Sequence, residues 1–332
     1  MLPLVGDRIL RENVLLSRIL GAAKKGKWEG ETMKKTIKVA KNTTGGFFTG
    51  YDLLDTTATD NLKQMSFAPA FRYKTVSLAG TDLTINAISS TKIIDLAAQQ
   101  MESASKDLAD DMGNDFYAGV GTGITMNGLG NILDDGTTAA TYGGLTRATY
   151  PALSSTKTAS GGVISFAKLA TLYNAISDGS MTPTVGVCDR TTFSLIESLF
   201  LPMQRIETTV DMYKGGLKGG TGFTALMYKG IPIIADRKAT SGTFYFINED
   251  ALDFFSVNPE GAAALGFEAF KFKTVEDGTP QDYGQPMGLG FSWGGWKKPI
   301  NQFAVVSQIL FAGNFISWDP RRMGSLTGVS SV

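Results

Sequence analysis

The sequence has no histidine and only one cysteine, Cys188. Without histidine the chain cannot build a Ser-His-Asp or Cys-His catalytic site, a histidine-ligated metal site or an imidazole proton shuttle. A single cysteine can form neither an internal disulfide nor a thiolate metal cluster. Cys188 ends an apolar strand pattern, which favours a buried structural thiol over a nucleophile. We therefore expect no catalysis, no cofactor and no metal.

Excess charge of one sign and long apolar runs are also missing. Lysine plus arginine and aspartate plus glutamate number 31 each, so the composition gives no reason to expect tight nucleic-acid binding. No stretch approaches the roughly 18 uninterrupted apolar residues of a membrane span. Arg8, Arg11 and Arg18 interrupt the first apolar residues, which argues against a signal peptide. These patterns predict a protein made in the cytosol, without membrane contact.

Several short motifs suggest ligand binding but lack the required context. The glycines of 119–123 follow a helix, whereas a dinucleotide fingerprint follows a strand, and the glycines of 215–222 lack the Gly-Lys-Ser/Thr ending of a phosphate loop. Both segments are predicted connectors. Trp293 and Trp296, next to two lysines, suit base stacking, but packing within a strand is the commoner role.

Apolar periodicity predicts a mixture of helices and strands in an α+β or α/β arrangement. The clearest element is a helix over 88–118, in which one apolar stripe recurs every three or four residues. Asp115 interrupts that stripe. The other predicted helices cover 9–23, 166–177 and 191–201; the predicted strands cover 32–42, 67–78, 83–85, 184–188, 226–236, 243–252 and 303–315.

The first quarter of the chain has few residues to bury for its length. Residues 32–87 therefore indicate a long hairpin stretched over another surface rather than a compact domain. The amphipathic segment 9–23 has two interpretations: an arm that packs on a neighbour, or an ordinary helix of the same domain.

The order of these elements resembles the major capsid protein of tailed phages, of the Hong Kong 97 type. The resemblance covers about 47–326 and depends on many short stretches in the same order, among them Gly50-Tyr51-Asp52, Phe71-Arg72-Tyr73-Lys74, Ile93-Ile94-Asp95-Leu96, Tyr228-Lys229-Gly230-Ile231-Pro232 and Gly313-Asn314-Phe315. It implies an N-terminal arm (1–31), an extended β-hairpin loop (32–87), a peripheral domain with a spine helix (88–118 and 257–305) and an axial domain (119–256 and 306–332).

The resemblance also implies a function and partners. The chain would assemble as hexamers and pentamers into the icosahedral head of a double-stranded DNA bacteriophage, made in the host bacterial cytoplasm and located in the virion. It would meet a portal protein, a decoration or cement protein in some members, and packaged DNA through weak non-specific contacts. Only about thirty residues precede the first hairpin strand, so a separate scaffold protein, or none, is expected. An encapsulin-type nanocompartment shell is the alternative, and a glycine-rich metabolic enzyme is a third interpretation.

Two further expectations concern links between subunits. Some members of this family join a loop lysine to an asparagine covalently; Lys63 is expected near the loop tip, but no matching acceptor and carboxylate motif accompanies it. The first hairpin strand is basic, and one flank of the long helix is acidic, so these stripes either meet between subunits or are solvated separately. The residues concerned are Lys34, Lys35, Lys38, Lys41, Asp107, Asp110 and Asp111. Their carboxylates lie along one helix, which argues against a metal site.

Overall fold

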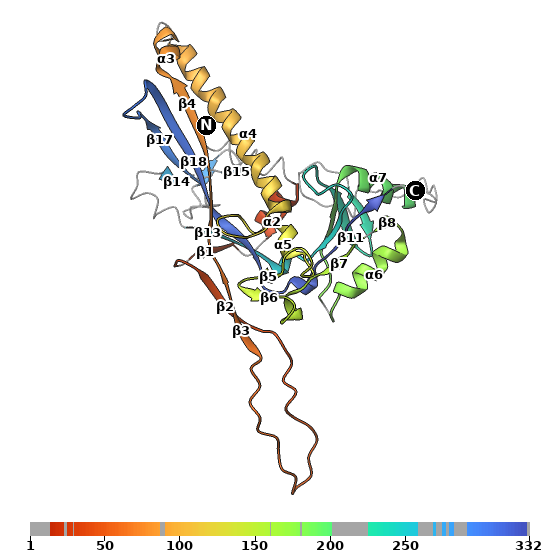
Figure 1. Ribbon diagram of the computed structural model, residues 1–332. Coiled ribbons are helices and arrows are strands. Elements are labelled where there is room, and N and C mark those ends of the chain that lie inside the picture. The colour runs from red at the N-terminus through yellow and green to blue at the C-terminus, as the bar shows by residue number, and fades with distance from the viewer. Residues whose placement is uncertain are drawn as a thin grey trace.

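The computed structural model describes residues 14–22, 25–28, 30–86, 90–159, 161–179, 181–200, 225–257, 268–269, 274–276, 279–281 and 291–330. It has three parts (Figure 1): an elongated lobe around a long sheet, a second lobe around another sheet, and a hairpin that projects away from both. No helix in these ranges is long and apolar enough to cross a membrane.

The elongated lobe contains a six-stranded sheet in the order β1-β13-β18-β17-β14, with β4 paired to the other edge of β18. Strand β18 carries β4 antiparallel along ten residue pairs, from Ala304 opposite Ala79 to Gly313 opposite Ala70. The strands are β1 (Lys25–Trp28), β4 (Ala70–Ala79), β13 (Leu252–Val257), β14 (Glu268–Ala269), β17 (Phe291–Lys297) and β18 (Ala304–Ser317).

Helix α4 (Ser90–Ala118) packs along this sheet beside β4 (Figure 1). The predicted apolar stripe is its buried face: Met101, Leu108 and Phe116 are all buried. The predicted long helix over 88–118 is confirmed. Its expected conflict at Asp115 is resolved by Arg72 of β4, which forms an ion pair with that half-buried carboxylate.

The second lobe is a six-stranded mixed sheet in the order β10-β11-β9-β12-β19-β7, with helices α6 (Phe166–Ile176) and α7 (Arg190–Phe200). Alternation along β12 assigns its two faces: Phe244 and Phe246 pack with the helices, whereas Tyr245 and Ile247 face the other core. The strands are β7 (Thr156–Thr158), β9 (Val185–Cys188), β10 (Ala225–Tyr228), β11 (Ile231–Ala235), β12 (Phe244–Ile247) and β19 (Gly324–Leu326).

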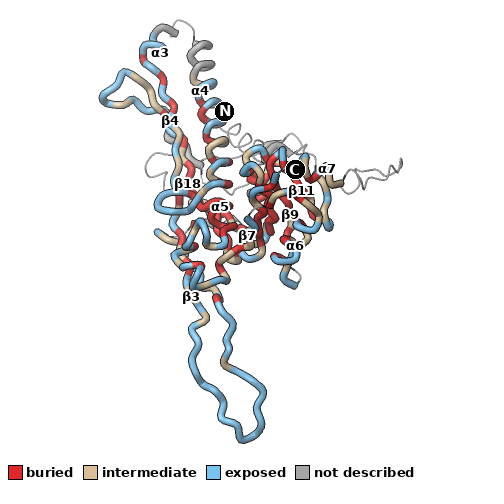
Figure 2. The backbone as a smooth tube through the Cα atoms, turned by 45° about the vertical axis from the view of Figure 1, so that its right-hand side comes forward, coloured by how far each residue is buried: buried red, intermediate tan, exposed pale blue. Residues whose placement is uncertain are grey.

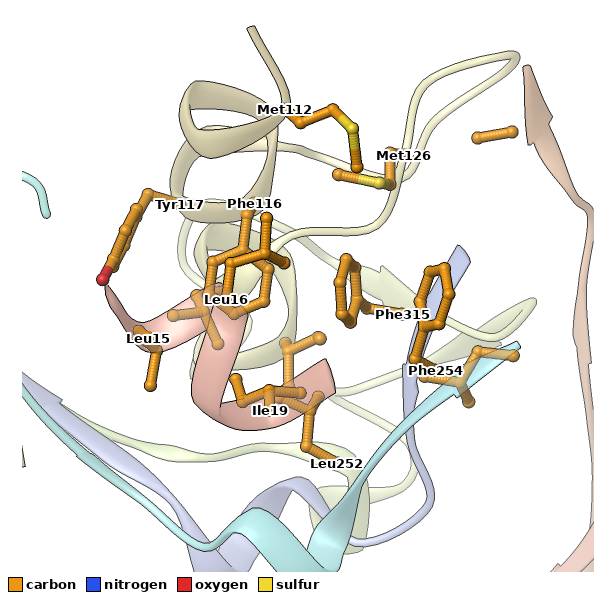
Figure 3. Close-up of a cluster of buried hydrophobic side chains, with 14 of the residues drawn as sticks. Leu15, Leu16, Ile19, Met112, Phe116, Tyr117, Met126, Leu252, Phe254 and Phe315 are labelled. Atoms are coloured by element: carbon orange, nitrogen blue, oxygen red, sulfur yellow. The ribbon is translucent and has the colours of Figure 1, made fainter. Parts of the chain in front are cut away.

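The N-terminal helix α2 (Val14–Ala22) is buried in the core shared by the two lobes. Figure 3 shows Leu15, Leu16 and Ile19 among side chains of α4, β13 and β18. Arg18 forms an ion pair with Glu249, and the backbone N–H of Leu15 donates to the buried Asp236 carboxylate at 3.1 Å. Of the two sequence interpretations, the helix that packs within its own domain is therefore correct, and the arm that packs on a neighbour is wrong for these residues.

The projecting hairpin consists of β2 (Met33–Lys38) and β3 (Leu62–Phe67), joined by a long loop. The remaining elements are short connectors. They are α3 (Gly80–Asn86), α5 (Leu129–Ile132), η1 (Pro151–Leu153), η3 (Glu249–Ala251), η4 (Pro320–Arg322), β5 (Thr141–Tyr142), β6 (Leu145–Thr146), β8 (Gly162–Val163), β15 (Thr274–Glu276), β16 (Thr279–Gln281) and β20 (Val329–Ser330).

Three expectations need correction. Residues 83–85, predicted as a strand, lie in helix α3, because three apolar residues are too few to define a period. Within the segment 32–87, β4 belongs to the long sheet and only 33–67 form the hairpin. Within 306–332, most of β18 pairs with β4, β13 and β17, away from the second lobe's sheet. The predicted glycine connector 215–222 lies outside the described residues.

Candidate assembly surfaces

The loop between β2 and β3 consists of two extended arms that run side by side without forming a β-sheet. Its two arms stay in register through the N–H of Val39, which donates to the carbonyl of Asn61 at 2.9 Å, and the hydroxyl of Thr44, which donates to the carbonyl of Thr57 at 3.1 Å. Both pairs are centred on Gly50 and Tyr51, where the chain turns. We call residues 42–60 the loop tip.

The loop tip exposes five large apolar side chains, and Figure 2 shows this part of the chain as almost wholly exposed. They are Phe47, Phe48, Tyr51, Leu53 and Leu54. The side chains of Phe47, Tyr51 and Leu53 are fully exposed, at 110%, 104% and 101%. Scattered single apolar residues on a surface are ordinary, but a cluster of this size marks an interaction site.

Short polar turns shape the loop tip. The Asp52 carboxylate accepts from the N–H of Thr49 at 2.8 Å and from its hydroxyl, and Asp55 accepts in the same way from Thr57. These hydrogen bonds lower the pKa of both carboxyl groups, since they stabilise the charged form. The loop therefore presents a preformed, negatively charged and apolar surface, which reduces the ordering cost when a partner binds.

The root of the hairpin is anchored firmly in its own chain. Met65 and Phe67 are buried, and the Phe67 ring packs edge-on against Tyr142, with ring centroids 5.2 Å apart. The N–H of Ser66 donates to the carbonyl of Gly143 at 2.9 Å. Gly143 has φ +57°, and an added Cβ there would lie 3.0 Å from Met65 and Phe67. The hairpin is therefore aimed by a rigid base while its tip has no contact with the core.

The predicted basic residues lie on this hairpin. Lys34, Lys35 and Lys38 are exposed on β2, and Lys41 is exposed at the start of the loop. The ammonium group of Lys35 lies over the Trp318 ring, 4.7 Å from its centroid.

The predicted acidic residues lie on α4, and the chain does not bring them near those lysines. Asp111 forms ion pairs with Arg72 at 3.0 Å and with Lys74 at 2.7 Å, both on β4. Burial acts to raise the pKa of Asp111, but these two cations lower it more. Asp110 pairs with Lys238.

Asp107 is exposed, and no ion pair to it is found in the part of the chain that the structure describes. Sequence reasoning missed the cationic partners Arg72, Lys74 and Lys238. The spacing of Arg72 and Lys74, on one face of a strand, was the available signal.

Lys63 lies in the paired strand β3, opposite Ile37, where it forms an ion pair with Asp60. Its expected position near the loop tip is therefore wrong, because the chain turns at Gly50 and Tyr51.

Two more surfaces expose apolar side chains. A groove of about 400 Å³ lies between β4, the end of α4 and the following loop, with Phe71, Val120 and Ile124 exposed at its edge. Its charges balance, since Arg72 is held by Asp111 and Asp115.

The other surface is the end of β17 together with the turn that joins it to β18, residues 296–303, which we call the distal turn. There Ile300 is 102% and Phe303 76% exposed, next to Lys297 and Lys298. Trp296, at the end of β17, is 36% exposed beyond a bulge that separates it from Trp293.

Comparison with solved structures finds the same fold in a phage capsid, in an encapsulin and in a further phage protein. A subunit of the cyanophage A-1(L) capsid is 15% identical, with a TM-score of 0.71 over 96% of this chain and 93% of that chain. The SrpI encapsulin of Synechococcus elongatus PCC 7942 is 10% identical, with a TM-score of 0.57 over 95% of this chain and 87% of that one. A chain of Microbacterium phage Oxtober96 is 12% identical, with a TM-score of 0.52 over 93% and 90%.

Neither a family model nor a curated protein matches the sequence. Since the match to the cyanophage capsid subunit runs over nearly the whole of both chains, it covers both lobes and the hairpin together. The predicted α+β fold of the Hong Kong 97 type is confirmed, and this chain has the fold of tailed-phage capsid subunits.

Proposed function

We propose that this chain is the major capsid protein of a tailed double-stranded DNA bacteriophage, which self-assembles into the icosahedral head. The observation that carries this proposal is the loop tip: a preformed, apolar and exposed surface on a rigidly anchored hairpin. A surface of this kind in a monomer is an aggregation hazard, whereas between copies of a shell subunit it becomes the contact.

Magnitudes favour apolar burial as the main driving force. Fully burying a large apolar side chain contributes roughly 1.5–3 kcal/mol, and the loop tip carries five of them. An exposed ion pair contributes only about 0.2–1 kcal/mol. The loop tip therefore outweighs several surface ion pairs in assembly.

Assembly of the purified protein tests the proposal. We expect closed shells with hexameric and pentameric units in electron micrographs. A variant in which residues 44–57 are replaced by a two-residue Asn-Gly turn should fold and stay dispersed, because the cut leaves the root intact. A wild-type chain that remains monomeric at all concentrations and salt conditions would contradict the proposal.

An encapsulin-type shell is the second candidate, because the SrpI encapsulin has the same fold over most of its length. The two candidates differ in content. Shells of a nanocompartment purified from a bacterial host contain a co-expressed protein cargo, whereas a phage head protein gives shells without cargo that accept DNA only in the presence of a portal protein. Mass spectrometry of purified shells separates the two.

The proposed phage head carries further expected partners. This proposal includes a portal protein at one vertex and, in some heads, a decoration protein. It also includes weak non-specific contact with DNA, and either a separate scaffold protein or no scaffold. The equal numbers of acidic and basic residues support weak contact, because tight binding needs an excess of positive charge. Proteins that copurify with heads from infected cells test these partners.

The two charged stripes are a further proposed contact between subunits. Asp110 and Asp111 already have partners in their own chain, so Asp107 is the acidic residue best placed to meet Lys34, Lys35, Lys38 or Lys41 of a neighbour. Reversing Asp107 to lysine should slow assembly at low salt, and reversing Lys34 and Lys38 to glutamate in the same chain should restore it. Equal assembly of Asp107→Lys and wild type in 20 mM salt would contradict this contact.

A further inference from the structure

A small polar pocket lies where the root of the hairpin meets the loop that follows α4. Its volume is about 110 Å³, and it is bounded by the end of β3, that loop, the β5–β6 turn and one residue of β18. None of the described residues that line it is charged. The pocket therefore has room for a small ion with a few water molecules, and its walls supply neutral polar groups.

Three buried asparagines form one wall of this pocket, and their hydrogen bonds determine how each amide points. The Oδ1 atom of Asn314 accepts from the backbone N–H of Asn127 at 2.8 Å, while its Nδ2 atom donates to the carbonyl of Ala68. Asn127 donates through Nδ2 to the carbonyl of Phe315 at 3.0 Å, so its Oδ1 atom is free to face Asn131. There it accepts from Nδ2 of Asn131 at 2.6 Å. All three amide orientations are therefore fixed.

This chain of hydrogen bonds leaves one acceptor over, the Oδ1 atom of Asn131. Asn131 is only 6% exposed, and this atom accepts no hydrogen bond from any residue that the structure describes. Buried polar atoms in native proteins are met by a protein group, an ion or ordered water. Since each amide nitrogen of the wall already donates within the chain, the wall offers an oxygen to a ligand that is positively charged or donates a hydrogen bond.

Gly121 keeps this wall open to the pocket. It has φ +62°, and an added Cβ would lie 2.5 Å from Oδ1 of Asn127 and 2.8 Å from Nδ2 of Asn131. Backbone conformation and space therefore both require glycine at this position. A side chain here would press on the paired amides that border the pocket.

The charged groups linked to this wall balance one another. Arg147 is buried and donates to the carbonyl of Asn131, and Lys157 pairs with Asp134 at 2.8 Å. Burial lowers the pKa of Arg147, while Asp134 and Asp135 act against that shift. Two cations thus accompany two carboxylates, and the pocket itself offers only neutral oxygens. Divalent ions normally take several carboxylate ligands, whereas potassium can be held by carbonyl oxygens alone.

We propose that this pocket binds one monovalent cation of the size of sodium or potassium, with Oδ1 of Asn131 as a ligand. The bound ion lies between the end of β3, the loop after α4 and the β5–β6 turn, and so braces the root that aims the hairpin. The site belongs to a single chain. It therefore goes beyond the proposed function and does not depend on assembly.

Direct binding to dispersed protein tests this site. Thallium(I), an ion of nearly the size of potassium, serves as the probe in equilibrium dialysis against choline acetate. We expect one thallium ion per chain, displaced by potassium or sodium and not by choline. Asn131→Leu, which removes the oxygen at similar volume, should weaken binding at least about 10-fold. The matched control is Asp52→Asn with Asp55→Asn at the exposed loop tip, which should bind like wild type.

The stability of the wild-type chain supplies a second measurement that needs no variant. Replacing choline acetate by about 100 mM potassium acetate at equal ionic strength should raise the ratio of folded to unfolded protein in urea at least about 10-fold, because the ion binds only the folded chain. The amide of Ser66, which donates to Gly143 at the hairpin root, should also exchange more slowly. Equal stability in the two salts, or thallium binding that Asn131→Leu leaves unchanged, would overturn the proposal.

Discussion

Removing the buried side chain of Ile19 tests whether the N-terminal helix belongs to the core of its own chain. Ile19 is 0% exposed and lies between the two lobes, with Leu15 and Leu16 beside it on α2 (Figure 3). The change Ile19→Ala removes three carbon atoms from this core and leaves a cavity among side chains that α4, β13 and β18 hold in place.

The expected loss follows from this complete burial. Substitutions of buried isoleucine by alanine reduce the free energy of unfolding by about 2–5 kcal/mol, because the cavity cost adds to the lost transfer free energy. The free energy of unfolding of a native protein is only about 5–15 kcal/mol, so this loss is a large fraction of it. The matched control is Leu53→Ala, since Leu53 is fully exposed in the loop tip. Its effect on the same quantity should stay within about 0.5 kcal/mol.

Urea unfolding of dispersed, unassembled protein, followed by tryptophan fluorescence, measures both variants. The two variants should differ in opposite respects. Ile19→Ala should unfold at a lower urea concentration than wild type, whereas Leu53→Ala should unfold like wild type but assemble more slowly. If Ile19→Ala and wild type unfold at the same urea concentration, α2 is not held in the core in solution, and an arm that docks on a neighbour becomes the better account.

Three smaller predictions concern buried groups. Tyr142→Phe should destabilise the chain by about 1–3 kcal/mol in urea unfolding, because the hydroxyl donates to the carbonyl of Ser317 and accepts from its N–H. Burial raises the pKa of Tyr142 to about 12, so between pH 10 and 12 the unfolded chain loses a proton that the folded chain keeps. The free energy of unfolding should therefore fall as the pH rises through this range. An equally steep fall in Tyr142→Phe would show that other groups cause it. The thiol of Cys188 should react with a thiol-specific dye only after unfolding, since it is buried in β9; rapid reaction of the native protein would refute that placement.

Local periodicity predicted those helices and strands in which apolar positions recur many times. Helix α4 was predictable because its stripe recurs over seven apolar positions, and α6 and β9 were predicted within one or two residues of their observed ends. Helix α3 was not, since its few apolar residues suit a strand as well as a helix. The fold was identified through resemblance, because no local pattern states which strands pair.

The candidate site was predictable only in part. Sparse apolar content indicated a long hairpin, and residues 33–67 form one; that the hairpin lies over another surface stays a prediction. The ion pairs of α4 were not foreseen, because Arg72 and Lys238 reach Asp115 and Asp110 through the tertiary fold. The polar pocket at the hairpin root was also missed, since its three asparagines meet only in the tertiary fold.

The pairing of β18 with β4 has a consequence for synthesis. Ala79 pairs with Ala304, about 225 residues later in the chain, so β4 lacks this strand partner until β18 has left the ribosome. At about 5–20 residues per second, the strand waits roughly 10–45 s with Val76 and Leu78, which are buried in the finished fold, still uncovered. Stalled nascent chains that end before residue 304 should therefore be cleaved within 70–79 by protease, and release of longer chains should abolish that cleavage. A chain timed in this way completes its elongated lobe only after β18 has been made, so a chain that stops before residue 304 lacks the strand that covers β4.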